Sequence, residues 1–280
     1  MQAKEQKLVM PEFTADYGVR PDQTRKYLNE GHILLRGVIT PEEAETARQV
    51  IADVSARHNK ETKALKDRDT YHKAFLQTGN LWEKDAEVKK FSLAKRFAKI
   101  AAKLMDVDGV RMYHDQALFK EPGGGHTPWH QDQYYWPLDT TKTITMWMPL
   151  VHAPLELGTL VFATGSHIDG PLASIHISDE AEAFFNRTVM EKEYPLAINE
   201  MRAGDATFHS GWTLHKAPGN ATNRMRAAMT IIYFADGTKV HEPRNQHQPA
   251  DLKVFLDGKA PGSVADGPLN PLLWHKDWEK

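Results

Sequence analysis

The chain has 280 residues, of which 41% are hydrophobic, and its 35 basic and 37 acidic side chains give a formal charge of −2. This near balance argues against a nucleic-acid-binding protein, which usually carries a basic excess, and it offers no polybasic signal for a membrane surface. Cysteine is absent, so disulfides and cysteine-ligated clusters are excluded, and any metal must be held by histidine, aspartate or glutamate.

The N-terminal part, residues 1–108, is predicted to be mainly helical. A short helix is expected over 25–30, a strand over 32–38 and a longer helix from about 85 to 105. The first residues, MQAKEQKLVMPEF, lack the basic-then-apolar order of a signal peptide, and no run of about 18 apolar residues could span a bilayer. We therefore expect a cytoplasmic protein that does not enter a membrane.

The clearest signal for the N-terminus of a helix lies at Thr40. Pro41 occupies the first helical position, and Glu43 stands three residues after Thr40, which is the pattern of a capping box. Apolar residues then follow at helical spacing and should face a core: Ala44, Ala47, Val50, Ile51 and Val54.

From Val110 the pattern changes to short strand-like runs separated by Gly, Pro and Asn clusters, as in a β-sandwich or barrel. These runs fill residues 109–236, with one helical insert near 178–189. Residues 237–280 are rich in Pro, Gly, Asn and His and are predicted to form an ordered-loop extension. Because no repeat or low-complexity linker divides the chain, we expect one domain over 1–280, with the helical part packed on the β core.

The segment WHQDQYYW contains His130 and Asp132 among aromatic residues. If residues 129–133 are extended, these two side chains point to the same face, because strand side chains alternate with a period of two. An imidazole and a carboxylate side by side form half of a metal site. The alternative is a buried hydrogen-bonding couple, and the H-x-D triplet by itself does not distinguish the two.

A second cluster lies about 85 residues further on. His215 ends a strand-like run, a turn over 218–220 follows, and Arg226 enters the next strand. A distal histidine would complete a two-histidine, one-carboxylate face, and a guanidinium nearby could hold a carboxylate by a bidentate pair. His209 competes with His215 and Arg224 competes with Arg226, since each pair has an even separation and faces one side of a strand.

These segments make the sequence resemble the phytanoyl-CoA dioxygenase family of iron(II)/2-oxoglutarate oxygenases. The likeness includes GHILLRGVITPEEAETAR, WHQDQYYWPL, GTLVFATGSH and AGDATFHSGWTLHKAPGN. It implies a mainly β fold with helical decoration, whose core is a double-stranded β-helix (jelly-roll, cupin-like). It also implies that His130, Asp132 and His215 bind Fe(II), and that Arg226 holds the far carboxylate of 2-oxoglutarate, with O2 as the other co-substrate.

Further site residues are expected around this centre. The resemblance matches Asn220 and Trp147 to positions near the co-substrate, and Gln116, on the strand before the iron pair, is another candidate to reach it. Three residues close to the iron pair are candidates for contact with substrate: His126, Tyr134 and Trp136.

The resemblance implies hydroxylation of an unactivated C–H bond of a small-molecule or acyl substrate, with release of succinate and CO2. Asp132 favours hydroxylation over halogenation, because related halogenases replace this carboxylate with a small residue. The alternative is a cupin-like metal enzyme or binding protein that does not use 2-oxoglutarate. The sequence leaves the substrate and the oligomeric state open.

Overall fold

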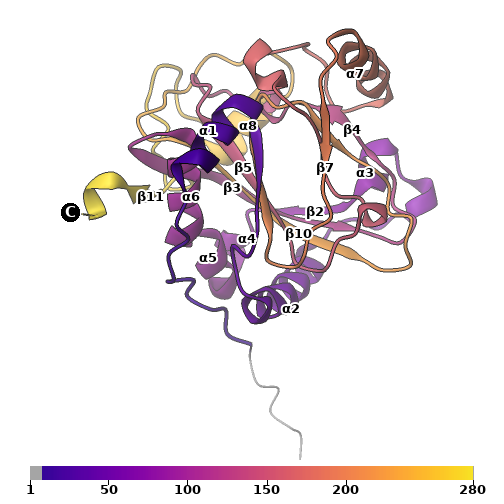
Figure 1. The fold of residues 1–280 in the computed structure, drawn as a ribbon, viewed down its shortest axis with the longest axis horizontal. Helices are drawn as coiled ribbons and strands as arrows, with labels where there is room; N and C mark the ends of the chain where they lie inside the picture. Colours follow the sequence, from indigo (N-terminus) through magenta and orange to yellow (C-terminus); the bar gives the residue numbers. More distant parts are fainter. Residues whose placement is uncertain (1–7, 280) are drawn as a thin grey trace, which may run out of the picture.

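Two antiparallel sheets form the centre of the computed structural model, which describes residues 8–279 (Figure 1). The larger sheet has the order β1-β8-β5-β10-β3-β11 with β2 also paired to β3, and the smaller has the order β4-β9-β6-β7. This is the jelly-roll core that the sequence predicted. The strands are β1 (His32–Leu35), β2 (Leu76–Gly79), β3 (Gly109–Lys120), β4 (Thr127–His130), β5 (Thr143–Pro149), β6 (Val161–Ala163), β7 (Leu196–Ile198), β8 (Ala206–Ser210), β9 (His215–Ala217), β10 (Arg226–Ala235) and β11 (Leu272–His275).

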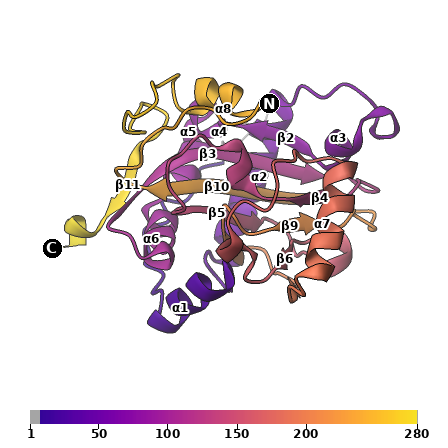
Figure 2. The same ribbon diagram turned by 90° about the horizontal axis from the view of Figure 1, so that it is seen from above.

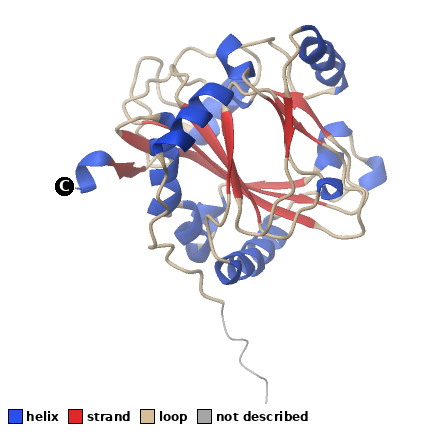
Figure 3. Cartoon of the chain, in the orientation of Figure 1, coloured by secondary structure: helices blue, strands red, loops and turns tan. Residues whose placement is uncertain are grey.

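Most helices lie outside the larger sheet, and α7 lies beside the smaller one (Figures 2 and 3). The helices are α1 (Pro21–Glu30), α2 (Pro41–His58), α3 (Thr70–Ala74), α4 (Leu81–Lys84), α5 (Ala86–Ser92), α6 (Lys95–Met105), α7 (Asp179–Glu191) and α8 (Gln248–Phe255). The predicted helical insert is therefore present as α7. None of the helices within residues 8–279 combines the length and the apolar composition that a membrane span requires.

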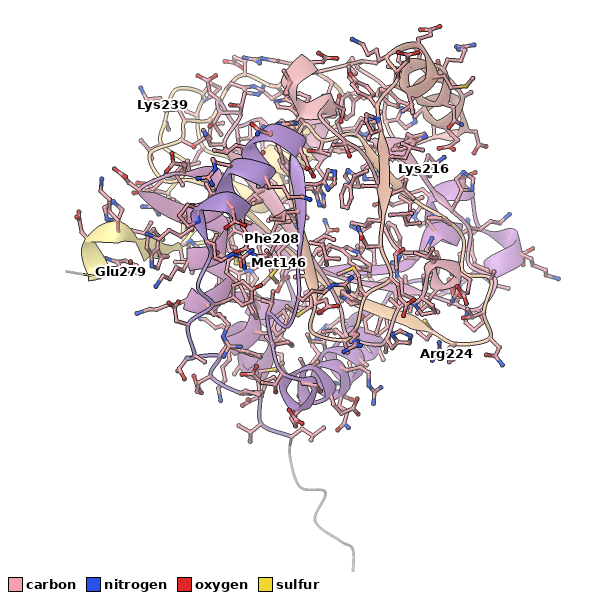
Figure 4. All side chains as sticks on the ribbon, in the orientation of Figure 1. Met146, Phe208, Lys216, Arg224, Lys239 and Glu279 are labelled. Carbon is pink, nitrogen blue, oxygen red and sulfur yellow. The ribbon has the colours of Figure 1, made fainter. Side chains whose placement is uncertain are left out.

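The larger sheet has one face for the core and one for the site. Met146 of β5 pairs with Phe208 of β8, and both are fully buried in the core that the helices cover (Figure 4). The adjacent pair, Thr145 and His209, points to the other face and lines a cavity between the sheets. The alternation along a strand thus separates structural residues from candidate functional ones.

The capping box at α2 is confirmed. The Thr40 hydroxyl accepts from the Glu43 amide at 3.2 Å, and the Glu43 carboxylate accepts from the Thr40 amide at 2.8 Å. All five apolar residues predicted to face the core are buried. The local chemistry of this segment is sufficient to set where the helix begins and which face it buries.

The single helix predicted over 85–105 is wrong, because the chain breaks at Leu93 and Ala94 into α5 and α6. Ala94 has non-helical backbone angles, with φ −59° and ψ 122°. Asp85 caps α5 by accepting from the amides of Glu87 and Val88. The turn lets each short helix bury its own apolar face against the core, which one straight helix of this length could not do.

The C-terminal extension is more regular than predicted. It contains α8, and its last strand, β11, pairs with β3 at the edge of the larger sheet (Figure 2). Partly buried Leu252 and Phe255 of α8 pack on a cluster that includes Tyr113 and Trp136. The extension therefore builds part of the wall of the site.

Candidate metal and co-substrate site

A cavity of about 640 Å³ lies between the two sheets and holds most of the candidate residues. The larger sheet supplies alternate residues of β3, β5 and β10, and the smaller sheet supplies the ends of β4 and β9. Because these strands are paired along their length, the side chains at their ends are held in fixed relative positions.

His130, Asp132 and His215 meet at one point of this cavity. His130 ends β4 and pairs directly with His215, which begins β9. The Oδ1 atom of Asp132 lies 3.4 Å from Nε2 of His130 and 3.8 Å from Nε2 of His215. One ligand atom from each residue falls within a group spanning 4.8 Å, the compact arrangement that a metal ion would need.

The expected strand over 129–133 is shorter than predicted. β4 ends at His130, and Asp132 begins a 3-10 helix over Asp132–Tyr135. Gln131 between them still has extended angles, φ −117° and ψ 120°, so His130 and Asp132 keep a common side. The Gln131 amide points elsewhere and donates to the carbonyls of Gly170 and Trp212 at 2.8 and 2.6 Å.

Both imidazoles are oriented for metal binding by the backbone. Nδ1 of His130 lies 2.8 Å from the Pro128 carbonyl, and Nδ1 of His215 lies 3.0 Å from the Thr213 carbonyl. Since a carbonyl only accepts, each Nδ1 must carry the proton, and each Nε2 presents a lone pair to the centre. Burial lowers the pKa of His215 well below its ordinary value.

Asp132 is held as a carboxylate by the histidines around it. Burial alone would raise its pKa, but His215, His130 and His209 hold the pKa well below its usual range. Its second oxygen, Oδ2, accepts from the Thr145 hydroxyl at 2.9 Å and lies 3.2 Å from Nε2 of His209. His209 is thus beside the triad and oriented toward Asp132, not toward the point where the three ligand atoms meet.

Arg226 lies in the same cavity with unused hydrogen-bonding capacity. It is 1% exposed, donates from Nη1 to the Gly158 carbonyl at 2.8 Å, and has no partner for Nε. No carboxylate among residues 8–279 pairs with it, and its guanidinium stands 5.3 Å over the ring of Trp147. Burial lowers the pKa of Arg226 to about 9, so it remains charged at neutral pH. A buried, unpaired guanidinium calls for an anionic ligand.

Burial distinguishes the two arginines, Arg224 and Arg226, that the sequence offered as partners for a carboxylate. Arg224 is exposed and lies at the periphery of the molecule (Figure 4), whereas Arg226 is buried.

Asn220 does not line the cavity. Its amide donates to the carbonyls of Lys120, Glu121 and Arg224, so it shapes the turn that delivers Arg226 into β10. The structure therefore gives Asn220 a role in this turn, and its contact with the co-substrate stays a prediction.

The remaining candidates divide into two groups. Gln116, Trp147 and Trp136 line the cavity. His126 is exposed and Tyr134 contributes its backbone carbonyl to Asn245 and Gln248, and neither side chain is part of the cavity lining.

Several lining residues were missed by the sequence. α8 places Asp251 and Phe255, four residues apart, on its cavity side, and α3 contributes Tyr71. Asp251 and Phe255 share the i, i+4 spacing of one helix face. No motif marks them, because their role depends on how the extension docks on the sheet.

A jelly roll with an H-x-D pair, a distal histidine and a buried unpaired arginine defines the class of non-haem iron oxygenases that use 2-oxoglutarate. The chain belongs to the phytanoyl-CoA dioxygenase family, whose model matches residues 27–228. This membership confirms the predicted enzyme class, an iron(II)- and 2-oxoglutarate-dependent dioxygenase with O2 as oxidant.

Known relatives agree with this assignment. The chain is 23% identical over 287 residues to phytanoyl-CoA dioxygenase domain-containing protein 1 of Danio rerio, covering 82% of this chain and 95% of that protein. Among solved structures, the non-heme alpha-ketoglutarate-dependent carbocyclase SnoK from nogalamycin biosynthesis superposes with a TM-score of 0.75 at 24% identity, covering 91% and 96% of the two chains. The epimerase SnoN, solved with Fe3+, alpha-ketoglutarate and nogalamycin RO, gives 0.73 at 22% identity and covers 90% and 98%. At these identities, the two structures support the fold.

Proposed function

We propose that the protein hydroxylates an unactivated C–H bond of a small molecule. In this reaction R–H, 2-oxoglutarate and O2 give R–OH, succinate and CO2, with one oxygen atom of O2 in the alcohol and the other in succinate. The observation that carries the proposal is the coexistence, in one cavity, of the His130, Asp132, His215 group and the unpaired guanidinium of Arg226.

The three ligand residues would hold iron(II) on one side and leave positions open for the co-substrate and O2. Bound iron supplies the activation of O2 that no side chain can provide. His130 and His215 contribute their Nε2 lone pairs, which the carbonyls of Pro128 and Thr213 keep turned inward. Asp132 occupies the third position as a carboxylate, which favours hydroxylation over halogenation.

Arg226 would bind the far carboxylate of 2-oxoglutarate. Its Nε and free Nη donors match a carboxylate, and Trp147 covers one face of the guanidinium. Gln116 and Thr230 pair across the sheet and line the same stretch of cavity wall. Such walls exclude water from the reacting groups, which protects the oxidant from unproductive reduction.

The test is an anaerobic titration of the protein with iron(II) and 2-oxoglutarate, followed by the weak visible charge-transfer band of their chelate. We expect the band in the wild type, and an affinity for 2-oxoglutarate lowered by about 100-fold or more in Arg226→Ala, with iron binding retained. Arg224→Ala is the matched control, because Arg224 is exposed outside the cavity. It should titrate like the wild type.

Two results would overturn the proposal. One is no band with intact iron binding, together with no succinate formed in air, which would favour a cupin-like metal protein that does not use 2-oxoglutarate. The other is an Arg226→Ala variant that binds 2-oxoglutarate as well as the wild type does.

A further inference from the structure

The cavity has two ends, and the proposed function uses only one of them. Arg226 stands opposite Lys120 at the end of β3, whereas Tyr113, seven residues earlier on β3, donates to Asp251 of α8 at 3.1 Å. At about 3.3 Å per residue, these two positions on β3 lie roughly 23 Å apart. The end at Asp251 is thus far from the 2-oxoglutarate clamp.

The triad lies toward the Asp251 end. Asp132 is bonded to Thr145, which pairs across the sheet with Ile232, and Ile232 pairs in turn with His114, the residue after Tyr113. A molecule anchored near Asp251 would therefore lie next to the metal ligands. This is the place that a substrate must occupy if 2-oxoglutarate fills the other end.

The charged side chains that the proposed function leaves unassigned in the cavity are all of one sign. Asp132 and Arg226 are already assigned to iron and 2-oxoglutarate, and no other arginine or lysine among residues 8–279 lines the cavity. The remaining charged side chains of the lining are three carboxylates: Asp69, Asp179 and Asp251.

Asp251 differs from the other two carboxylates in its surroundings. Asp69 accepts from the His72 amide and Asp179 accepts from the Thr70 hydroxyl, both near the surface. Asp251 is partly buried, and its one side-chain partner among residues 8–279 is the Tyr113 hydroxyl. No cation of this part of the chain neutralises it. A β-bulge on β3 leaves Tyr113 without a partner on β10 and supports this contact.

The walls beside Asp251 are aromatic, and they include one imidazole with unused capacity. His114 is 2% exposed, lines the cavity, and has no hydrogen-bond partner for Nδ1. Its ring stacks on Phe255 at 4.1 Å, and burial lowers its pKa to about 4, so it is neutral and does not pair with Asp251 as a cation. Four further aromatic side chains line the cavity: Tyr71, Phe75, Tyr135 and Trp136.

We propose that the substrate is a small organic cation whose ammonium group binds Asp251 between these aromatic rings. A carboxylate and ring faces are the two features that bind an ammonium group. An acyl-CoA would bring phosphates toward three carboxylates and no free cation, which disfavours it. This inference rests on the proposed function for the reaction and adds the class of substrate.

The test uses three probes of similar size and different charge: benzylammonium, benzyl alcohol and benzoate. Each is titrated anaerobically into the holoenzyme with iron(II) and 2-oxoglutarate, and binding is read from perturbation of the visible band. We expect benzylammonium to bind at least about tenfold more tightly than benzyl alcohol, and benzoate to bind least. Asp251→Asn should abolish the preference, and Asp257→Asn, an exposed residue just beyond α8, should keep it.

The outcomes separate this inference from the function on which it rests. Absence of the band before any probe is added contradicts the proposed function. A normal band with no preference for benzylammonium, or with a preference that persists in Asp251→Asn, overturns the inference alone. A normal band with no benzylammonium binding also overturns it. Tighter binding of benzoate would identify an acidic substrate instead.

Discussion

The Nε2 atom of His209 lies 3.2 Å from Oδ2 of Asp132, while Oδ1 of the same carboxylate faces His130 and His215. The two oxygens of one aspartate are thus divided between a fixed hydrogen-bonding partner and the metal position. A carboxylate held in this way cannot rotate freely, and outer contacts of this kind commonly change metal affinity 10- to 100-fold.

We therefore expect His209→Phe to weaken iron(II) binding by about 10- to 100-fold without unfolding the protein. The phenyl ring fills the same space but donates no hydrogen bond to Asp132. Competition with a chelator under anaerobic conditions measures the change. Thr145→Val, which removes the other bond to Oδ2, should act in the same direction, and His126→Ala, at an exposed position, should have no effect. Unchanged iron affinity in His209→Phe would show that Asp132 needs no such support.

Trp147→Leu should raise the KM for 2-oxoglutarate by about 2- to 30-fold. Its ring lies 5.3 Å under the Arg226 guanidinium, and a desolvated cation–π contact is worth about 0.5–2 kcal/mol. The measurement is succinate formation at varied 2-oxoglutarate concentration. Trp136→Leu is the matched control. Trp136 also lines the cavity but packs on Tyr113 near the other end, so its loss costs stability and leaves this KM unchanged.

The pair His130 and Asp132 could be predicted because its arrangement depends only on the local conformation of the chain. Alternation along an extended segment brings His130 and Asp132 to one side, and this held even though the strand ends at His130, since Gln131 remains extended. The choice of Arg226 over Arg224 could not be made in this way. The two residues are two positions apart and face the same side of a strand, so the sequence favoured Arg226 only through the family resemblance, and in the folded protein burial distinguishes them.

Tertiary packing decided the features that the sequence did not predict. The apolar spacing of residues 85–105 continues across Leu93 and Ala94, where neither glycine nor proline marks the break between α5 and α6. Asp251 lies in a segment rich in polar and loop-forming residues, and its side chain contacts Tyr113 only because α8 docks on β3. Local patterns predict helix caps and the alternation of side chains along a strand. They do not predict which distant surface an element will cover.

Asp115 of β3 gives a prediction about stability. Oδ1 accepts from the Leu81 amide at 2.7 Å, and Oδ2 accepts from the Trp82 amide at 3.0 Å and from the Ser92 hydroxyl at 2.6 Å. The carboxylate caps α4, whose own N-cap residue, Asn80, makes no side-chain cap. Asp115→Ala leaves three buried donors unpaired, and we expect the free energy of unfolding to fall by about 3–6 kcal/mol.

Urea unfolding measures this loss, and Asp115→Asn is the comparison. The amide of Asn keeps one accepting oxygen but turns a donor toward groups that are themselves donors, so its loss should be smaller and still clear. A loss below about 1 kcal/mol in Asp115→Ala would mean that water replaces the carboxylate at these amides.

Burial of Asp251 should make the protein less stable as the pH rises from about 4 to 7. Burial raises the pKa of this carboxyl from 3.8 to about 7, and the bond from Tyr113 offsets only part of the rise. Between these values the folded protein holds a proton that the unfolded chain releases, so the free energy of unfolding falls with pH in this window and levels off above it. Asp251→Asn removes the effect, and the difference between wild type and variant should change by a few kcal/mol, about 1.4 per unit of pKa shift.

Urea unfolding of both proteins at pH 5, 6, 7 and 8 measures this difference, in which the titration of Tyr71, Tyr113 and His247 around Asp251 largely cancels. Asp257→Asn, at an exposed position, should follow the wild type at every pH. A difference that stays constant with pH would show that Asp251 ionises as an ordinary carboxyl. If Asp251 binds an ammonium group, added benzylammonium should raise the Tm of the wild type more at pH 8 than at pH 6, because only the ionised carboxylate attracts the cation. The stability lost by keeping an unpaired carboxylate in the cavity is then recovered when its ligand binds.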